Sequence, residues 1–240
     1  MGLNISRDRF VMFDDTHQSR VDTSLEGNPT AGRVKDIDLK FVFRRNHTGD
    51  KDRDGNPLIY AFKGMNNYKI VPMYRKMFLT RAKLIVEGMK DDLKPDYVMP
   101  VPSSNGFGAE FGRCVSDWIE VPFLQPSFLS KKTIQDILDE EAQKKRKISN
   151  KRTLRKYNNQ MATWKGMEAG QHVSMKELDK KIRPFFNPLT VSGAMPNIAG
   201  KNILVTDDLM SSGTSIWSAA ELVRGGGAVV DTSVCFLSGL

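Results

Sequence analysis

Cysteine and histidine are scarce in this chain, which has two cysteines and three histidines among its 240 residues. A structural zinc site needs about four such ligands at short, fixed spacings, and a disulfide framework needs several cysteine pairs. Cys114 and Cys235 lie far apart in the sequence, each among apolar neighbours, and His17, His47 and His172 are scattered. We therefore expect no zinc cluster, and two reduced, buried thiols.

Long hydrophobic runs are missing as well. No run approaches the ~20 apolar residues of a membrane-spanning helix, and residues 1–15 lack the apolar segment of a signal peptide. Hydrophobic residues nevertheless make up 40% of the chain, an ordinary share that suffices for a sizeable core. The sequence therefore predicts a soluble, cytoplasmic protein that does not bind a membrane.

Acidic side chains are missing from residues 144–156, where eight residues are Lys or Arg. The net charge of the whole chain is +8, so the rest of the sequence is balanced. Three interpretations of this basic segment are open: the solvated face of a charged helix over residues 134–156, a cationic flap over a substrate, or a contact with nucleic acid. In the last case Tyr157 and Trp164 could stack a base.

Residues 201–227 are the stretch that carries the most chemistry. An apolar run, residues 203–205, ends in Asp207 and Asp208, and a turn of small residues then leads into a segment with helical patterning. The N–H groups and the dipole at a helix start favour an anion there, and Gly213 lets the backbone approach a phosphate closely. The carboxylates would repel a phosphate, so we expect them to face sugar hydroxyls or a hydrated Mg²⁺. A ribose with a 5′-phosphate and a metal-bound diphosphate carries all of these groups.

The segment Ile203-Leu-Val-Thr-Asp-Asp-Leu-Met-Ser-Ser-Gly-Thr-Ser215 resembles the phosphoribosyl-pyrophosphate (PRPP) signature of the type I phosphoribosyltransferases. The resemblance implies that Asp207 and Asp208 are the catalytic acids, which hold the ribose hydroxyls and, directly or through water or ribose, Mg²⁺. It also implies that the 5′-phosphate is wrapped by Leu209, Met210, Ser211, Ser212, Gly213, Thr214 and Ser215. The alternative interpretation is a strand that ends in a helix-capping turn, with Ser211 or Ser212 as the N-cap.

A second strand, loop and helix occur earlier in the chain. Residues 95–100 are typical of a buried strand and residues 107–119 of a helix, and between them Ser103, Ser104 and Asn105 supply short hydrogen-bond donors. The family has its pyrophosphate loop after the first core strand, so the resemblance implies that role here; a plain turn before a helix is the alternative. Met99-Pro-Val-Pro102 is also similar to a motif of the ComF-like branch, although the zinc module usual in that branch is missing.

Residues 126–200 contain the longest irregular region of the sequence. A compact domain seldom carries so long a connection without a function, and the family has a mobile flap in this interval. A cationic flap could neutralise the charge that develops on a departing pyrophosphate. We expect the contributing cations among Lys131, Lys132, Arg146, Lys147, Arg152 and Arg155.

The first 66 residues have mainly β-type patterns. A short strand is predicted at residues 10–13, and the apolar runs 39–43 and 58–62 flank a connection rich in Gly and Asp, which predicts a hairpin. Residues 50–55 copy half of a calcium loop, but Ala61 stands where that loop needs a bidentate Glu. A solvated hairpin turn is therefore the favoured interpretation.

The order of elements, which includes a helix over residues 71–90 and a short strand at 121–124, predicts an α/β fold. Its parallel sheet places the ligand loops at the carboxyl ends of the strands. The resemblance implies a type I phosphoribosyltransferase fold in which residues 67–240 form the core, with residues 126–200 as a long basic flap. Residues 1–66 are then an N-terminal β-rich hood.

The activity implied by the resemblance is Mg²⁺-dependent transfer of a phosphoribosyl group from PRPP to a small-molecule acceptor, with release of pyrophosphate, in a homodimer. The 6-oxopurine branch has an Asp at the position of Ser211, which argues against hypoxanthine or guanine as the acceptor. Two other classes stay open. One is a protein that senses PRPP or a nucleotide without turnover and binds nucleic acid through residues 144–156; the other is a hydrolase or lyase acting on a ribose phosphate.

Overall fold

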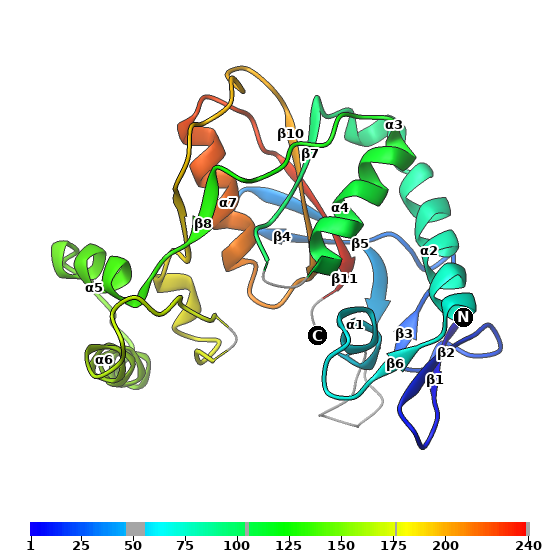
Figure 1. The fold of residues 1–240 in the computed structure, drawn as a ribbon, viewed down its shortest axis with the longest axis horizontal. Coiled ribbons are helices and arrows are strands. Elements are labelled where there is room, and N and C mark those ends of the chain that lie inside the picture. Colours follow the sequence, from blue (N-terminus) through cyan, green and yellow to red (C-terminus); the bar gives the residue numbers. More distant parts are fainter. Residues whose placement is uncertain (47–55, 104–105, 176, 239–240) are drawn as a thin grey trace.

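The computed structural model describes residues 1–46, 56–103, 106–175 and 177–238 (Figure 1). Their centre is a six-stranded sheet with the order β3-β5-β11-β10-β7, in which β4 also pairs with β5. The strands are β3 (Val21–Asp22), β4 (Thr30–Val34), β5 (Ile37–Arg45), β7 (Tyr97–Pro100), β10 (Ile203–Leu209) and β11 (Thr232–Leu237). Neighbours in the series β5, β11, β10 and β7 run parallel. The predicted α/β class with a parallel sheet is thus confirmed.

Alternate residues of the central strands face two separate hydrophobic cores. Leu204 and Phe236 belong to the core shared with α2 (Pro72–Glu87) and α4 (Gly106–Ile119). Val205 and Cys235 belong to the core shared with α7 (Thr214–Gly225). Because both faces of the sheet are covered, its strands are nearly continuous apolar runs. Figure 1 shows the resulting three layers, with α2 and α4 on one side of the sheet and α7 on the other.

The helices predicted over residues 71–90 and 107–119 are confirmed as α2 and α4, and the short α3 (Lys90–Leu93) follows α2. None of the helices in the described part of the chain has the length and apolar character to span a bilayer. The strand predicted at residues 121–124 is reduced to a single parallel bridge between Val98 and Phe123. Pro122 has no N–H with which to extend a ladder, which limits the pairing at this edge of the sheet.

The N-terminal residues form a small second sheet with the order β1-β2-β6. Its strands are β1 (Gly2–Ile5), β2 (Phe10–Asp14) and β6 (Lys69–Ile70), so the strand predicted at residues 10–13 is confirmed. Residues 1–66 also supply β3, β4 and β5 to the central sheet. Residues 1–66 therefore contribute strands to the central sheet and also form β1 and β2 of the small second sheet.

The prediction of a strand at residues 58–62 is wrong, because these residues lie in helix α1 (Asn56–Lys63). Periodicity cannot assign so short an apolar run, whereas the Asn-Pro pair at positions 56 and 57 is a helix-start signal. The hairpin partner of β5 is β4 instead. The half calcium loop at residues 50–55 lies outside the described residues.

The long insert folds around a small core of its own. It contains β8 (Leu129–Lys131), α5 (Ile134–Gln143), α6 (Lys151–Lys165), the 3-10 helix η1 (Arg183–Phe185) and β9 (Leu189–Val191). Ile137, Tyr157, Trp164 and Phe186 are buried together in this core. In Figure 1, α5 and α6 lie apart from the central sheet, and the antiparallel pair of β8 and β9 connects them to it.

The single charged helix considered for residues 134–156 is in fact two helices, α5 and α6. A capping box starts α5: the Thr133 hydroxyl accepts from the Asp136 N–H, and the Asp136 carboxylate accepts from the Thr133 N–H. Asn150 starts α6 by accepting from the Thr153 N–H. Two independent start signals explain why the basic segment is broken between the helices.

Glu141 joins the two helices of the insert. Its side chain is 2% exposed and accepts from Arg146 Nη2 at 2.6 Å and from the Tyr157 hydroxyl at 2.7 Å. Burial opposes the charge on Glu141, but the hydrogen bonds from Arg146 and Tyr157 outweigh it and hold the pKa of Glu141 below its ordinary value. Burial and the bond to Glu141 raise the pKa of Tyr157. The pair is thus most stable as carboxylate and neutral phenol.

We expect the insert to lose stability in acid, as the pH falls through the lowered folded-state pKa of Glu141. A carboxyl group whose pKa is depressed by folding stabilises the fold above its unfolded pKa, and this contribution is lost on protonation. Hydrogen exchange of α5 and α6, corrected for intrinsic rates, should show the loss as the pH falls below about 4.3, the ordinary pKa of a glutamate. Glu141→Gln should flatten this pH dependence, whereas the exposed Glu168→Gln should leave it unchanged. If protection of α5 and α6 fell with pH in the same way in the wild type and in Glu141→Gln, the Glu141 carboxylate would not be the group that stabilises the insert.

Candidate functional site

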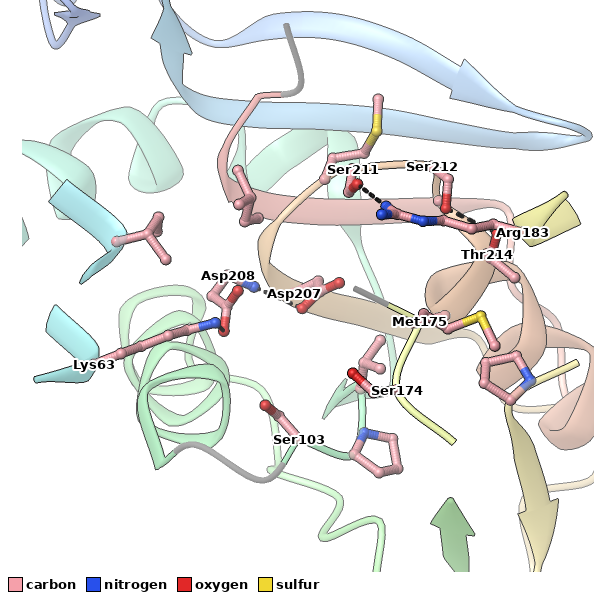
Figure 2. A pocket seen from close by; sticks show the side chains of 18 of the residues that line it. Lys63, Ser103, Ser174, Met175, Arg183, Asp207, Asp208, Ser211, Ser212 and Thr214 are labelled. Atoms are coloured by element: carbon pink, nitrogen blue, oxygen red, sulfur yellow. Dashed lines mark hydrogen bonds and ion pairs between the residues drawn. The ribbon is translucent and has the colours of Figure 1, made fainter. Parts of the chain in front are cut away.

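A cavity of about 520 Å³ opens at the carboxyl ends of β7 and β10 (Figure 2). One wall is α1 and the loop after it, and the opposite wall comes from the insert around residues 173–189. The loop after β7 and the turn after β10 complete the lining. The parallel sheet therefore brings together, at one edge, polar segments that are about a hundred residues apart in the sequence.

Asp207 and Asp208 line this cavity at the end of β10. Asp207 Oδ1 accepts a hydrogen bond from the backbone N–H of Asp208 at 2.8 Å. Asp208 Oδ2 lies 2.6 Å from Lys63 Nζ, and both side chains are 6% exposed (Figure 2). The two neighbouring carboxylates therefore differ: Asp208 is held in a buried ion pair, and Asp207 is oriented by the backbone.

The turn after β10 has the geometry of an anion site. Gly213 has φ +69° and immediately precedes Thr214, the first residue of α7. An added Cβ at Gly213 would lie 2.6 Å from Val34 Cγ2, so both the conformation and the packing require glycine. Ser212 Oγ and Thr214 Oγ1 are 2.9 Å apart and share a hydrogen bond. All seven residues of the predicted phosphate loop, 209–215, line the cavity.

The alternative interpretation of this turn, a helix cap by Ser211 or Ser212, is wrong. The residue at the N-cap of α7 is Gly213, and no side chain among the described residues caps the helix there by a hydrogen bond. The backbone N–H groups in the first turn of a helix have no partner within the helix. The start of α7 therefore faces the cavity with donors that an anionic ligand can use.

Arg183 reaches this turn from the insert. The residue is 9% exposed, and its guanidinium donates from Nη1 to Ser211 Oγ at 2.7 Å and from Nε to the Leu178 carbonyl at 2.9 Å. Burial lowers the pKa of Arg183 below its ordinary value. Because that ordinary value is very high, the guanidinium still stays charged at neutral pH. A fixed positive charge therefore lies beside the hydroxyls of the turn.

Positive charge dominates the cavity lining. Five basic side chains line it against two acidic ones; the basic residues are Arg45, Lys63, Lys131, Lys180 and Arg183. Lys63 and Arg183 were not among the predicted site residues. Lys63 follows the run that was misassigned as a strand, and the position of Arg183 depends on the fold of the insert. An excess of cations in a half-enclosed cavity favours a ligand with several negative charges.

The other predicted site residues divide into three groups. Ser103 lines the cavity, as expected for the loop after β7, whereas Ser104 and Asn105 lie outside the described residues. Of the predicted flap cations, Lys131 lines the cavity. The remaining five do not line it: Lys132, Arg146, Lys147, Arg152 and Arg155.

The structure gives a reason for the position of these five cations. Lys132 pairs with Glu140 and Arg146 with Glu141 inside the insert, so their charges are already compensated. Lys147, Arg152 and Arg155 are exposed on the insert. Across the described ranges, no three His, Cys, Asp or Glu side chains converge to hold a metal. A divalent ion beside Asp207 and Asp208 would thus need further oxygens from a ligand.

We expect Lys63→Met to destabilise the protein by about 3–5 kcal/mol, because it leaves the Asp208 carboxylate buried without its counter-charge. The double variant Lys63→Met/Asp208→Leu should recover most of this loss, since it removes both charges from the interior. Urea denaturation at neutral pH measures both effects. Equal destabilisation in the single and double variants would show that the two side chains are not coupled.

Gly213→Ala should destabilise the protein by about 1–3 kcal/mol, through a strained positive φ and overlap with Val34. Adding Val34→Ala removes the overlap but not the strain, so the double variant should lose less stability than the sum of the single ones. Gly170→Ala is the matched control, because no atom lies within 4 Å of its added Cβ. If the stability loss of the double variant equalled the sum of the losses of Gly213→Ala and Val34→Ala, the close packing of the turn against β4 would be contradicted.

No protein-family model and no curated protein matches the sequence. Solved structures that align with the chain include adenine phosphoribosyltransferase from Saccharomyces cerevisiae, at 18% identity and a TM-score of 0.37, over 70% of this chain and 71% of that one. The enzyme from Thermoanaerobacter pseudethanolicus aligns at 15% identity and a TM-score of 0.37, over 86% and 88%. The enzyme from Leishmania tarentolae aligns at 11% identity and a TM-score of 0.40, over 99% and 94%. Similarity at this level identifies neither substrate nor acceptor, so function has to be argued from the geometry of the site.

Proposed function

We propose that this protein is a PRPP-dependent phosphoribosyltransferase. The observation that carries the proposal is the adjacency, in one cavity, of the acid pair Asp207 and Asp208 with the turn 211–215 at the uncapped start of α7. Carboxylates suit the hydroxyls of a sugar, and the start of a helix suits a phosphate. A phosphorylated ribose presents both groups at once.

In this proposal the 5′-phosphate binds at the start of α7. It takes hydrogen bonds from backbone N–H groups of the turn and from the hydroxyls of Ser212 and Thr214, with the charge of Arg183 close by. This phosphate is remote from the reacting carbon, C1 of the ribose. Its binding energy can therefore hold the sugar in the orientation that the reaction needs.

The ribose hydroxyls donate to Asp207 and Asp208 in the same proposal. The ion pair with Lys63 does not exclude this role, because a carboxylate has about four acceptor positions and Lys63 occupies one oxygen of Asp208. Lys63 instead fixes the orientation of the acid. The pair also keeps Asp208 from adding an uncompensated negative charge to a cavity that must accept phosphates.

Pyrophosphate is the leaving group. As its bond to C1 breaks, positive charge develops on the sugar and negative charge on the departing oxygen, and the acceptor nitrogen attacks C1. Ser103 of the loop after β7 and Lys131 of the insert also line the cavity, where they can bind the diphosphate. Preorganised cations at this position stabilise the charge that develops in the transition state.

Mg²⁺ is part of the proposal as an ion shared between protein and substrate. Asp207 and Asp208 are the carboxylates of the cavity that would hold it, together with oxygens of the ligand. When bound, the ion neutralises charge on the diphosphate and makes it a better leaving group.

The acceptor we propose is a small nitrogenous base other than a 6-oxopurine. Ser211 cannot exchange a proton with a purine ring as a carboxylate would, and its hydroxyl accepts a hydrogen bond from Arg183. In this chain a permanent cation therefore contacts the residue that stands at the motif position of the 6-oxopurine acid. Tyr60, Met65 and Asn66 line the wall of the cavity formed by α1 and the loop after it, and in this proposal that wall faces the base.

Calorimetry of PRPP binding with and without Mg²⁺ tests the proposal. We expect Mg²⁺-dependent binding by the wild type, and loss of at least about 10-fold in affinity for Asp207→Asn, since it removes a charged hydrogen-bond acceptor. Asp207→Asn leaves the ion pair of Lys63 and Asp208 intact. A loss of PRPP binding in this variant therefore cannot come from unfolding caused by breaking that pair. The double variant Asp207→Asn/Asp208→Asn should abolish binding.

The matched control for the double variant is Asp91→Asn/Asp92→Asn, an exposed pair of adjacent acids on α3. This control should bind PRPP like the wild type. If the wild type does not bind PRPP at all, the proposed function fails. If it binds but releases no pyrophosphate with any base, the cavity serves recognition rather than transfer.

A further inference from the structure

The insert presents a second charged surface, away from the cavity. Among the eight basic residues of the segment 144–156, three are paired with acids: Lys144 with Glu140 and Glu141, Arg146 with Glu141, and Lys156 with Asp179. The other five are exposed and make no ion pair within the described residues; they are Lys145, Lys147, Lys151, Arg152 and Arg155. We name these five residues the basic face. Its charge is not used to stabilise the insert, so it is available to a partner.

The same helix lines a second, smaller cavity of about 180 Å³. Gln160, Thr163 and Trp164 of α6 form one side, and Gln171, His172 and Glu177 line the other. The volume corresponds to roughly six water molecules, enough for one planar heterocycle. Trp164 is buried at 4% exposure and contributes an aromatic surface, while the amides and the imidazole supply donors and acceptors.

The basic face and this cavity are spaced along one helix. Arg152 precedes Gln160, and Arg155 precedes Thr163, by eight residues, which is about 12 Å along the axis. A stacked single strand covers that length with three to four nucleotides at about 3.4 Å each. Phosphates of one strand can therefore contact the basic face while a nearby base enters the cavity.

We propose that the insert binds single-stranded nucleic acid, with its phosphates on the basic face and one unstacked base in the cavity beside Trp164. A single strand is favoured over a duplex, because its bases are free to leave the stack. A membrane surface is disfavoured, because the exposed positions at the start of α6 carry Lys151, Arg152 and Arg155 with a single exposed leucine, Leu154, which makes no apolar stripe. The inference does not depend on the proposed enzymatic activity.

Fluorescence anisotropy with labelled single-stranded DNA and RNA of about twelve nucleotides tests this surface in the full chain. We expect binding that weakens with salt, and a loss of at least tenfold for Arg152→Glu/Arg155→Glu. The plot of the logarithm of the association constant against the logarithm of the salt concentration should become less steep, its slope changing by about 1.4 or more. Two cations are removed, and each phosphate contact contributes about 0.7 to the steepness of this slope. The matched control is Arg7→Glu/Lys76→Glu, which makes the same change of net charge with two exposed residues outside the insert.

The cavity is tested with an oligonucleotide whose bases are replaced by abasic sites. The wild type should bind it at least threefold more weakly than the normal strand, and Gln160→Ala should reduce this difference. If the control variant Arg7→Glu/Lys76→Glu bound the oligonucleotide as weakly as Arg152→Glu/Arg155→Glu, the proposal would be overturned, because the effect would be one of net charge alone. It would also be overturned if the wild type bound polyglutamate or anionic lipid vesicles as tightly as the oligonucleotide.

Equal affinity of the wild type for the abasic and the normal strand would likewise overturn it.

Discussion

The ion pair between Lys63 and Asp208 connects the two halves of the candidate site. Lys63 is the last residue of α1, Asp208 lies one residue before the end of β10, and the pair lies buried at the floor of the cavity between them. Two charges removed from water are costly unless they compensate each other. The position of α1 over the carboxyl edge of the sheet is thus coupled electrostatically to the conformation of the acid pair. The cavity has its shape because this wall is fixed to its floor.

The rest of the site follows from the parallel sheet. β7 and β10 are neighbours and run in the same direction, so the loop that contains Ser103 and the turn 211–215 leave the sheet at the same edge. Gly213 then permits a turn too tight for any side chain, because Val34 of β4 packs against it. Arg183 closes the remaining side with a buried positive charge. The cavity thus combines an acid pair at the end of β10 with a buried cation beside the turn that follows.

The sequence predicts those parts of the structure that depend on local pattern. The strand, acid pair, turn and helix at residues 203–225 are one continuous signal, and all of their expected ligand-facing residues line the cavity. α1 was misassigned because five apolar residues fit a strand as well as a helix, and this error hid Lys63. Arg183 could not be predicted, since its contact with Ser211 joins segments 28 residues apart through the fold of the insert. Counting charge along the chain could not distinguish Lys131, which lines the cavity, from Arg152 and Arg155, which do not.

A crystal structure with ribose 5-phosphate, pyrophosphate and Mg²⁺ tests the proposed site most directly. The proposal predicts the 5′-phosphate at the start of α7, within hydrogen-bond distance of the backbone of residues 212–215, and the ribose hydroxyls on Asp207 and Asp208. Pyrophosphate is predicted near Ser103 and Lys131. A ribose phosphate bound elsewhere, with solvent alone at the turn 211–215, would contradict the assignment of this cavity as a phosphoribosyl site.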